Sequence, residues 1–283
     1  MRREAVAAAV VAAVAGIVVI PRLLQAVTDS MLFHPAAGQH TTPDRHGIPF
    51  EERWLDAEGT RIQAWWMPAS GAGTTIVTFH GNAGTLADRI PWYRPVVRTG
   101  VAVLAVEYRG FGDSDGSPSE EGLAADGRAG IAAARALANA RGDRLVVHGR
   151  SLGGAVAIRA VQEAEADGLR VDGLLVESTF TSLAEMAGRT GIPLAGRLVT
   201  YSFPSIERIG QAGSPLLLVH GTEDELIPLE MGERLVAAAS AGGRPATLLR
   251  IPGGTHNDTW ARGGPTYWDA VLGFFRAPGG GGR

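Results

Sequence analysis

The chain contains no cysteine and no lysine, and all 26 of its basic residues are arginine. Without cysteine there is no thiol nucleophile, no disulfide framework and no cysteine-ligated zinc site. Without lysine there is no Walker A phosphate-binding lysine, no Schiff base and no Ser-Lys dyad. The absence of lysine thus excludes nucleotide hydrolysis of the Walker type and pyridoxal chemistry.

Excess charge of either sign is also lacking. The formal net charge is −3 over 283 residues, which gives no electrostatic basis for a nucleic acid partner. At 45% hydrophobic residues the chain is long enough to bury a large core. We expect one folded domain over residues 31–277, preceded by a separate segment, 1–30, and followed by a loose glycine-rich tail, 278–283.

The most informative motif is Gly149-Arg150-Ser151-Leu152-Gly153, a G-x-S-x-G sequence. It follows the apolar run 145–148 and precedes a helix-like run, 155–166. A serine between glycines on a strand-to-helix turn is held in a strained backbone that exposes its hydroxyl group. The context predicts that Ser151 is a nucleophile.

A serine nucleophile needs a general base, and the base needs an acid to orient it. In α/β hydrolases these residues follow the serine in the order acid, then histidine. Of the seven histidines, only His256 lies late enough in the chain, in a turn after the apolar run 246–251. His80, His148 and His220 are expected to pack at strand ends.

Three acidic residues compete for the role of the acid in the turn after the apolar run 215–220. We favour Asp224 because its shorter side chain is held more rigidly and aspartate tolerates turn backbones well. Glu223 and Glu225 are the alternatives and are expected to be solvated. The oxyanion donors are predicted to be the backbone N–H groups of Leu152 and Asn82.

Apolar runs and helix-like runs alternate along the chain as a mostly parallel sheet requires. Eight strands are predicted, at 52–55, 61–67, 74–79, 101–107, 145–148, 171–176, 215–220 and 247–251. Helices are predicted at 120–140, 152–166, 229–239 and 265–276. The fold class is therefore α/β, with a short cap segment between the sixth and seventh strands.

With these elements in order, the chain resembles the α/β-hydrolase family, and within it the membrane-anchored BEM46-like branch of ABHD13-type and ABHD17-type hydrolases. The resemblance rests on segments 79–84, 107–114, 149–153, 177–182, 220–228 and 254–257 together with an apolar N-terminus. It implies a Ser-Asp-His serine hydrolase without metal or organic cofactor. It does not define the substrate.

The first 30 residues contain an unbroken apolar run from Ala5 to Ile20. Sixteen residues fall short of the ~20 that span a bilayer squarely, although flanking residues extend the run. We favour a membrane anchor over a cleaved secretory signal or a buried helix. Arg2 and Arg3 before the run, against Arg22 after it, favour a hydrolase domain outside the cytoplasm.

The segment 177–214 is short for a lid, which predicts a shallow and partly apolar pocket over Ser151. Such a pocket suits a small ester or thioester with an accessible acyl chain. The expected function is serine hydrolysis through an acyl-enzyme. The alternatives are a catalytically silent, membrane-tethered binding module of the same fold and a cofactor-free perhydrolase that uses the same residues.

Overall fold

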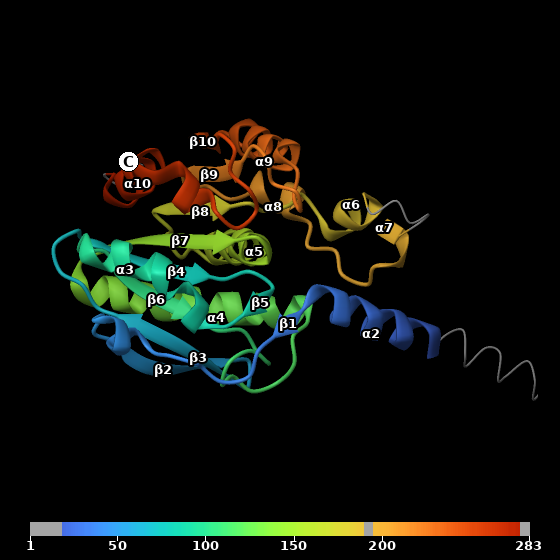
Figure 1. Ribbon diagram of the computed structural model, residues 1–283, viewed down its shortest axis with the longest axis horizontal. Helices are drawn as coiled ribbons and strands as arrows, with labels where there is room; N and C mark the ends of the chain where they lie inside the picture. The colour runs from blue at the N-terminus through green and yellow to red at the C-terminus, as the bar shows by residue number, and fades with distance from the viewer. Residues whose placement is uncertain (1–18, 190–194, 278–283) are drawn as a thin grey trace, which may run out of the picture.

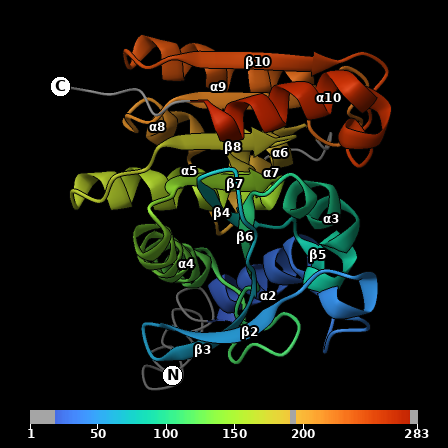
Figure 2. The same ribbon diagram turned by 90° about the vertical axis from the view of Figure 1, so that its left-hand side faces the viewer.

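An eight-stranded sheet forms the centre of the molecule in the computed structural model, which describes residues 19–189 and 195–277 (Figure 1). The strands run in the spatial order β10-β9-β8-β7-β4-β6-β3-β2, which Figure 2 shows from one edge to the other. Only the β2·β3 and β3·β6 pairs are antiparallel. The strand bounds are β2 Glu51–Ala57, β3 Thr60–Met67, β4 Thr74–Phe79, β6 Ala102–Val106, β7 Arg144–Arg150, β8 Gly173–Glu177, β9 Leu216–Gly221 and β10 Ala246–Ile251.

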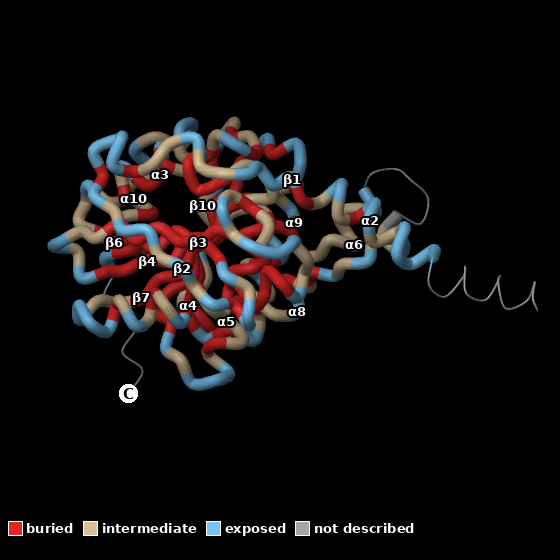
Figure 3. Tube along the Cα trace, turned by 90° about the horizontal axis from the view of Figure 1, so that it is seen from below, coloured by how far each residue is buried: buried red, intermediate tan, exposed pale blue. Residues whose placement is uncertain are grey.

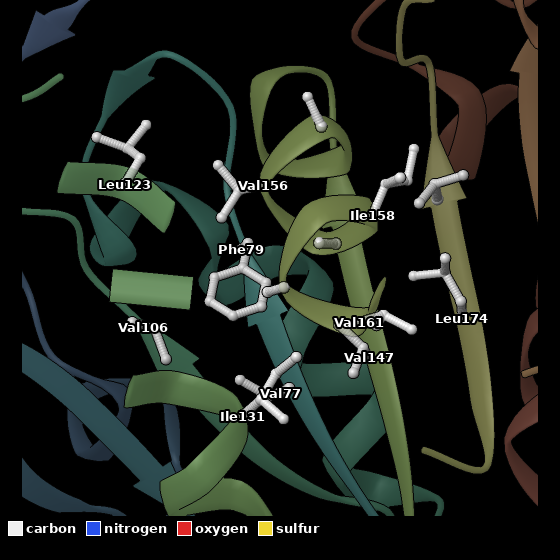
Figure 4. Close-up of a cluster of buried hydrophobic side chains, with 14 of the residues drawn as sticks. Val77, Phe79, Val106, Leu123, Ile131, Val147, Val156, Ile158, Val161 and Leu174 are labelled. Atoms are coloured by element: carbon white, nitrogen blue, oxygen red, sulfur yellow. The ribbon is translucent and has the colours of Figure 1, made fainter. Parts of the chain in front are cut away.

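The central strands are apolar on both faces because helices cover both faces. Successive residues point to opposite sides, so Val77 packs in one core cluster while its neighbour Ile76 packs in the other. Figure 4 shows the first cluster, where Phe79 lies among aliphatic side chains that include Val156 and Ile131. This double burial explains why the strands read as continuous apolar runs.

Helices α4 (Glu120–Arg141), α5 (Leu152–Ala166), α8 (Ser205–Ile209) and α9 (Leu229–Ala241) pack on the face of the first cluster. Helices α3 (Ile90–Arg98) and α10 (Thr259–Arg276) cover the other face. The parallel strands end at one edge, where the loops that carry the predicted site residues meet.

The predicted α/β sheet of eight strands is confirmed, with strand ends that differ by a few residues. Helix α3 lies in a gap between strands for which the sequence analysis gives no helix bounds; Pro91 stands in its first turn, where proline is tolerated, and Pro95 lies inside it. The helix forms because Ile90, Trp92 and other apolar residues bury one of its sides. Helix α10 begins at Thr259 instead of Pro265, since it continues across a kink at Gly264.

Helix α2 (Ile20–Leu32) lies at one end of the molecule, beside the short cap helices α6 (Leu183–Gly188) and α7 (Ala195–Leu198) (Figure 1). It is joined to the cap by a 2.6 Å hydrogen bond from the Tyr201 hydroxyl group to Asp29. The helix therefore continues through residue 30, where the sequence predicts the start of the hydrolase domain. Much of its surface is exposed (Figure 3).

After α2 the chain forms a two-stranded parallel sheet, in which β1 (His34–Pro35) pairs with β5 (Ala83–Gly84). Over residues 19–189 and 195–277, no helix has the length and apolar character needed to cross a membrane. Most of the apolar run from Ala5 to Ile20, and the predicted tail, lie outside the described residues.

Candidate active site

Ser151 lies between the end of β7 and the start of α5, with φ 54° and ψ −121°. A non-glycine residue at positive φ is strained, and this strain turns the serine away from the sheet. Gly149 and Gly153 make the turn possible: a Cβ at Gly149 would collide with the Gly153 carbonyl group, and one at Gly153 with the Phe79 carbonyl group. The turn has the backbone that a nucleophile elbow requires.

Two hydrogen bonds from neighbouring segments fix the Ser151 backbone. Its N–H group donates to the Glu177 carbonyl oxygen at 2.9 Å, and its own carbonyl oxygen accepts from the Thr179 hydroxyl group at 2.9 Å. Because both partners belong to the end of β8 and the loop after it, the strained turn is held by the adjacent strand.

His256 lies between Ser151 and Asp224. Its Nε2 is 3.1 Å from the Ser151 Oγ, and its Nδ1 is 2.9 Å and 3.1 Å from the two carboxylate oxygens of Asp224. A carboxylate accepts only, so Nδ1 carries the proton and donates it, which leaves the Nε2 lone pair facing the serine hydroxyl group. This arrangement can remove a proton from Ser151.

Asp224 is buried, whereas Glu223 and Glu225 are exposed. Burial by itself raises the pKa of Asp224, but hydrogen bonds from His220, from His256 and from the Ile227 N–H group lower that pKa far below its ordinary value. Of the three acids in this turn, the structure therefore places the side chain of Asp224 against the imidazole of His256. Glu225 instead accepts from the His256 backbone N–H group at 3.3 Å.

Asn82 and Leu152 line the same cavity as Ser151. Leu152 is the first residue of α5, so its N–H group has no acceptor in a preceding turn. The Asn82 side-chain amide donates to the Leu32 carbonyl oxygen at 2.9 Å. The backbone carbonyl oxygen of Asn82 accepts from the His34 N–H group at 2.8 Å. The end of α2 and strand β1 therefore position the loop that carries Asn82.

Comparisons with known proteins identify the family of this chain. The model of the family described as "Serine aminopeptidase, S33" matches residues 72–208. The "Alpha/beta hydrolase domain-containing protein WAV2" of Arabidopsis thaliana is 33% identical over 251 residues, covering 82% of this chain and 80% of that protein. The chain belongs to the α/β-hydrolase family.

Two further similarities come from a yeast and an archaeon. The α/β-hydrolase chain is 29% identical over 254 residues to the "Uncharacterized membrane protein YNL320W" of Saccharomyces cerevisiae, covering 82% of each. It is also similar to the structure of the Pyrococcus furiosus esterase Pf2001, with a TM-score of 0.70, 19% identity, and coverage of 86% of this chain and 96% of that one. At that identity the structural likeness shows the fold alone.

The hydrolase has a cavity of about 380 Å³ over Ser151, which we call the active-site cavity. Its apolar wall comes from α2, the cap and the loop after Asp224; this wall consists of Leu32, Phe180, Leu183, Met186, Leu226 and Ile227. The polar residues Arg89, Arg150 and Asn257 line the same cavity.

A second cavity, of about 290 Å³, lies behind Arg89 and Arg150. Trp92, Trp260, His148 and Glu177 are among the residues that line it. Both cavities are close to the lower end of the range for ligand sites, roughly 300 to 1,000 Å³. Nothing in the sequence assigned a role to either arginine, although Arg150 stands inside the G-x-S-x-G motif.

The other three strand-end histidines are buried and hydrogen-bonded. His80 Nε2 is 2.6 Å from Glu107, and His148 Nε2 is 3.2 Å from Glu177. His220 differs from the expectation of simple packing, since its Nε2 lies 2.7 Å from the Ile227 carbonyl oxygen and 3.4 Å from an Asp224 carboxylate oxygen. Its Nε2–H therefore helps to position Asp224, a contact that no sequence pattern indicates.

Proposed function

We propose that this hydrolase cleaves an ester or thioester through an acyl-enzyme at Ser151. The observation that carries the proposal is the 3.1 Å contact between His256 Nε2 and the Ser151 Oγ, with Asp224 on the other ring nitrogen. His256 takes the proton as Ser151 attacks the acyl carbonyl carbon, and then gives it to the leaving group. Water hydrolyses the acyl-enzyme by the same route.

The backbone N–H groups of Asn82 and Leu152 are proposed to bind the oxyanion. The Leu152 N–H lies at the N-terminus of α5, where the helix dipole adds to the stabilisation of negative charge. Ser151 and His256 need no metal and no organic cofactor for this reaction, because the imidazole moves the proton. The apolar wall of the active-site cavity favours a small-molecule substrate with an acyl chain.

We also propose that an N-terminal helix anchors the enzyme in a membrane, with the hydrolase domain outside the cytoplasm. Helix α2 exposes Ile20, Leu23, Val27 and Met31, which recur at helical spacing on one side. These residues continue the apolar run that starts at Ala5, so we propose that this side of α2 contacts the bilayer surface. The yeast relative is itself named a membrane protein.

The decisive experiment is labelling of the purified protein with a fluorophosphonate, followed by turnover of a panel of acyl esters, thioesters and aminoacyl amides. We expect one label, on Ser151, and turnover of esters or thioesters. Ser151→Ala should lose both, and Ser117→Ala, a change in an exposed loop, should lose neither. A folded protein that takes no label and turns over no substrate contradicts the proposal and favours a silent binding module.

A further inference from the structure

Arg89 and Arg150 stand at the boundary between the two cavities, and each lines both of them. Arg89 ends the short helix η3 (Leu86–Arg89), and Arg150 ends β7, directly before the nucleophile. Two guanidinium groups are thus held next to the reacting serine from separate parts of the chain.

Neither guanidinium group is within ion-pair distance of a carboxylate in the described parts of the chain. By contrast, Arg109 pairs with Asp126 at 2.8 Å and Arg159 pairs with Glu121 at 2.6 Å. Arg89 donates through Nη2 to the Ala83 carbonyl oxygen at 2.6 Å. Arg150 donates through Nη2 to the His256 carbonyl oxygen and, at 3.4 Å, to Asn257.

Within the described residues, each of these two guanidinium groups donates through Nη2 alone. Their Nη1 atoms therefore retain the capacity to donate to an acceptor. A guanidinium group offers a planar set of donors that matches a carboxylate or a phosphate.

The charge around the two cavities is unevenly distributed. The active-site cavity is lined by both arginines and by no carboxylate, since Asp224 lies behind His256. The second cavity adds Asp88 and Glu177. These two carboxylates offset the charge of the arginines around the second cavity. The positive charge without a carboxylate among the lining residues is therefore that of the active-site cavity.

The chemistry of the reaction decides which part of a substrate meets these arginines. The apolar wall takes the acyl chain. His256 must give its proton to the leaving oxygen or sulfur, so the leaving group departs on the side of the imidazole. Arg150 donates to the backbone carbonyl oxygen of His256 and lines the active-site cavity together with it.

We infer that Arg89 and Arg150 bind an anionic group, a phosphate or a carboxylate, carried by the leaving group of the substrate. This inference rests on the proposed function. Hydrolysis would then release two products: a carboxylic acid whose chain is apolar, and an alcohol or thiol that carries the phosphate or carboxylate.

The test compares three butyryl esters of primary alcohols on the full-length protein: those of glycerol, glycerol 3-phosphate and 3-hydroxypropanoate. We expect KM for at least one anionic ester to be about tenfold below KM for the glycerol ester, because charge-assisted hydrogen bonds are strong. Comparison of the two anionic esters distinguishes phosphate from carboxylate. Higher ionic strength should raise KM for the anionic ester and leave the neutral one unchanged.

Arg89→Gln should remove the preference by raising KM for the anionic ester to that for the glycerol ester. Arg89→Lys should keep part of it. Arg94→Gln is the matched control, since Arg94 is exposed on the next helix and lines neither cavity. Should Arg89→Gln fail to fold, inhibition of the wild type by glycerol 3-phosphate, but not by glycerol, provides an independent measure of anion binding.

Equal or higher KM for both anionic esters, with the neutral ester turned over and Ser151 labelled, overturns the inference and leaves the proposed function standing. Loss of the preference in Arg94→Gln to the same extent as in Arg89→Gln also overturns it. Absence of both labelling and turnover contradicts the proposed function instead, so the two failures are distinguishable.

Discussion

The backbone N–H group of Ser151 donates a 2.9 Å hydrogen bond to the carbonyl oxygen of Glu177. The side chain of Glu177 is fully buried beneath the second cavity and accepts hydrogen bonds from Tyr267 at 2.5 Å, His148 at 3.2 Å and Thr259 at 3.2 Å. Glu177, which holds the Ser151 backbone, is thus itself held by two elements of the fold, α10 through Tyr267 and Thr259 and β7 through His148.

Glu177→Ala should destabilise the protein by about 3 kcal/mol, because it leaves the buried partners of the carboxylate unpaired. Burial opposes ionisation of Glu177, but hydrogen bonds from His148 and Tyr267 and the charge of Arg150 hold its pKa below the ordinary value. Urea unfolding measures the loss. Glu233→Ala, which removes an exposed pair with Arg250, is the control and should change stability by less than about 1 kcal/mol. Similar losses for both variants would show that the buried network is not stabilising.

Ser151→Ala and His256→Ala should each lower kcat by at least about 10³-fold, while circular dichroism stays unchanged. The double variant should be no slower than either single one, because the two residues act as a unit. Steady-state kinetics on a butyryl ester measure this, and additive losses in the double variant would contradict a shared proton transfer.

Asp224→Asn should lower kcat by about 10³- to 10⁴-fold, because an amide cannot stabilise the imidazolium. Glu223→Gln and Glu225→Gln should leave turnover close to that of the wild type, since both side chains are exposed. If Glu225→Gln were the slow variant, Glu225 would be the acid in solution.

The lowered pKa of Asp224 predicts how stability depends on pH. The carboxyl group has a lower pKa in the folded state than its value of about 3.9 in the unfolded chain. Its contribution to stability is therefore present above the unfolded pKa, and it is lost as pH falls below about 5 toward the folded pKa. The difference in unfolding free energy between the wild type and Asp224→Asn should change little from pH 7 to pH 5 and should shrink as the pH falls from about 4 toward 2. A difference that is constant or grows as pH falls contradicts this assignment.

The full-length protein should remain in the membrane fraction after a carbonate wash, since a span is held by its apolar area. A protein that begins at Val19 keeps the whole of α2 and its contact with Tyr201, and it should be released by the wash with esterase activity intact. Recovery of the full-length protein in the soluble fraction at unchanged mass would contradict the anchor.

The sequence predicts the sheet because its strands are short apolar runs separated by turn residues, and the order of these elements leads to Ser151, to His256 and to a turn with three acids, from which the short side chain of Asp224 makes it the choice. The same reasoning could not find Arg89, because the sequence does not show that Arg89 lines the same cavity as Ser151. The bounds of helix α3 could not be predicted either, because burial of Trp92 and Ile90 supports a helix that contains Pro95, a residue unfavourable in a helix interior. The contact of His220 with Asp224 depends on loop geometry, which composition does not encode.

His256 follows β10, which is the last strand of the described residues and pairs only with β9 at the edge of the sheet. Ser151 and His256 are 105 positions apart in the sequence, so their contact is long-range. It forms only after the C-terminal strand has docked. Edge strands also open at lower free energy than the centre of a sheet. Activity should therefore disappear at urea concentrations where the central strands are still protected from hydrogen exchange, and a polypeptide still being synthesised cannot hydrolyse its substrate before its final strand is in place.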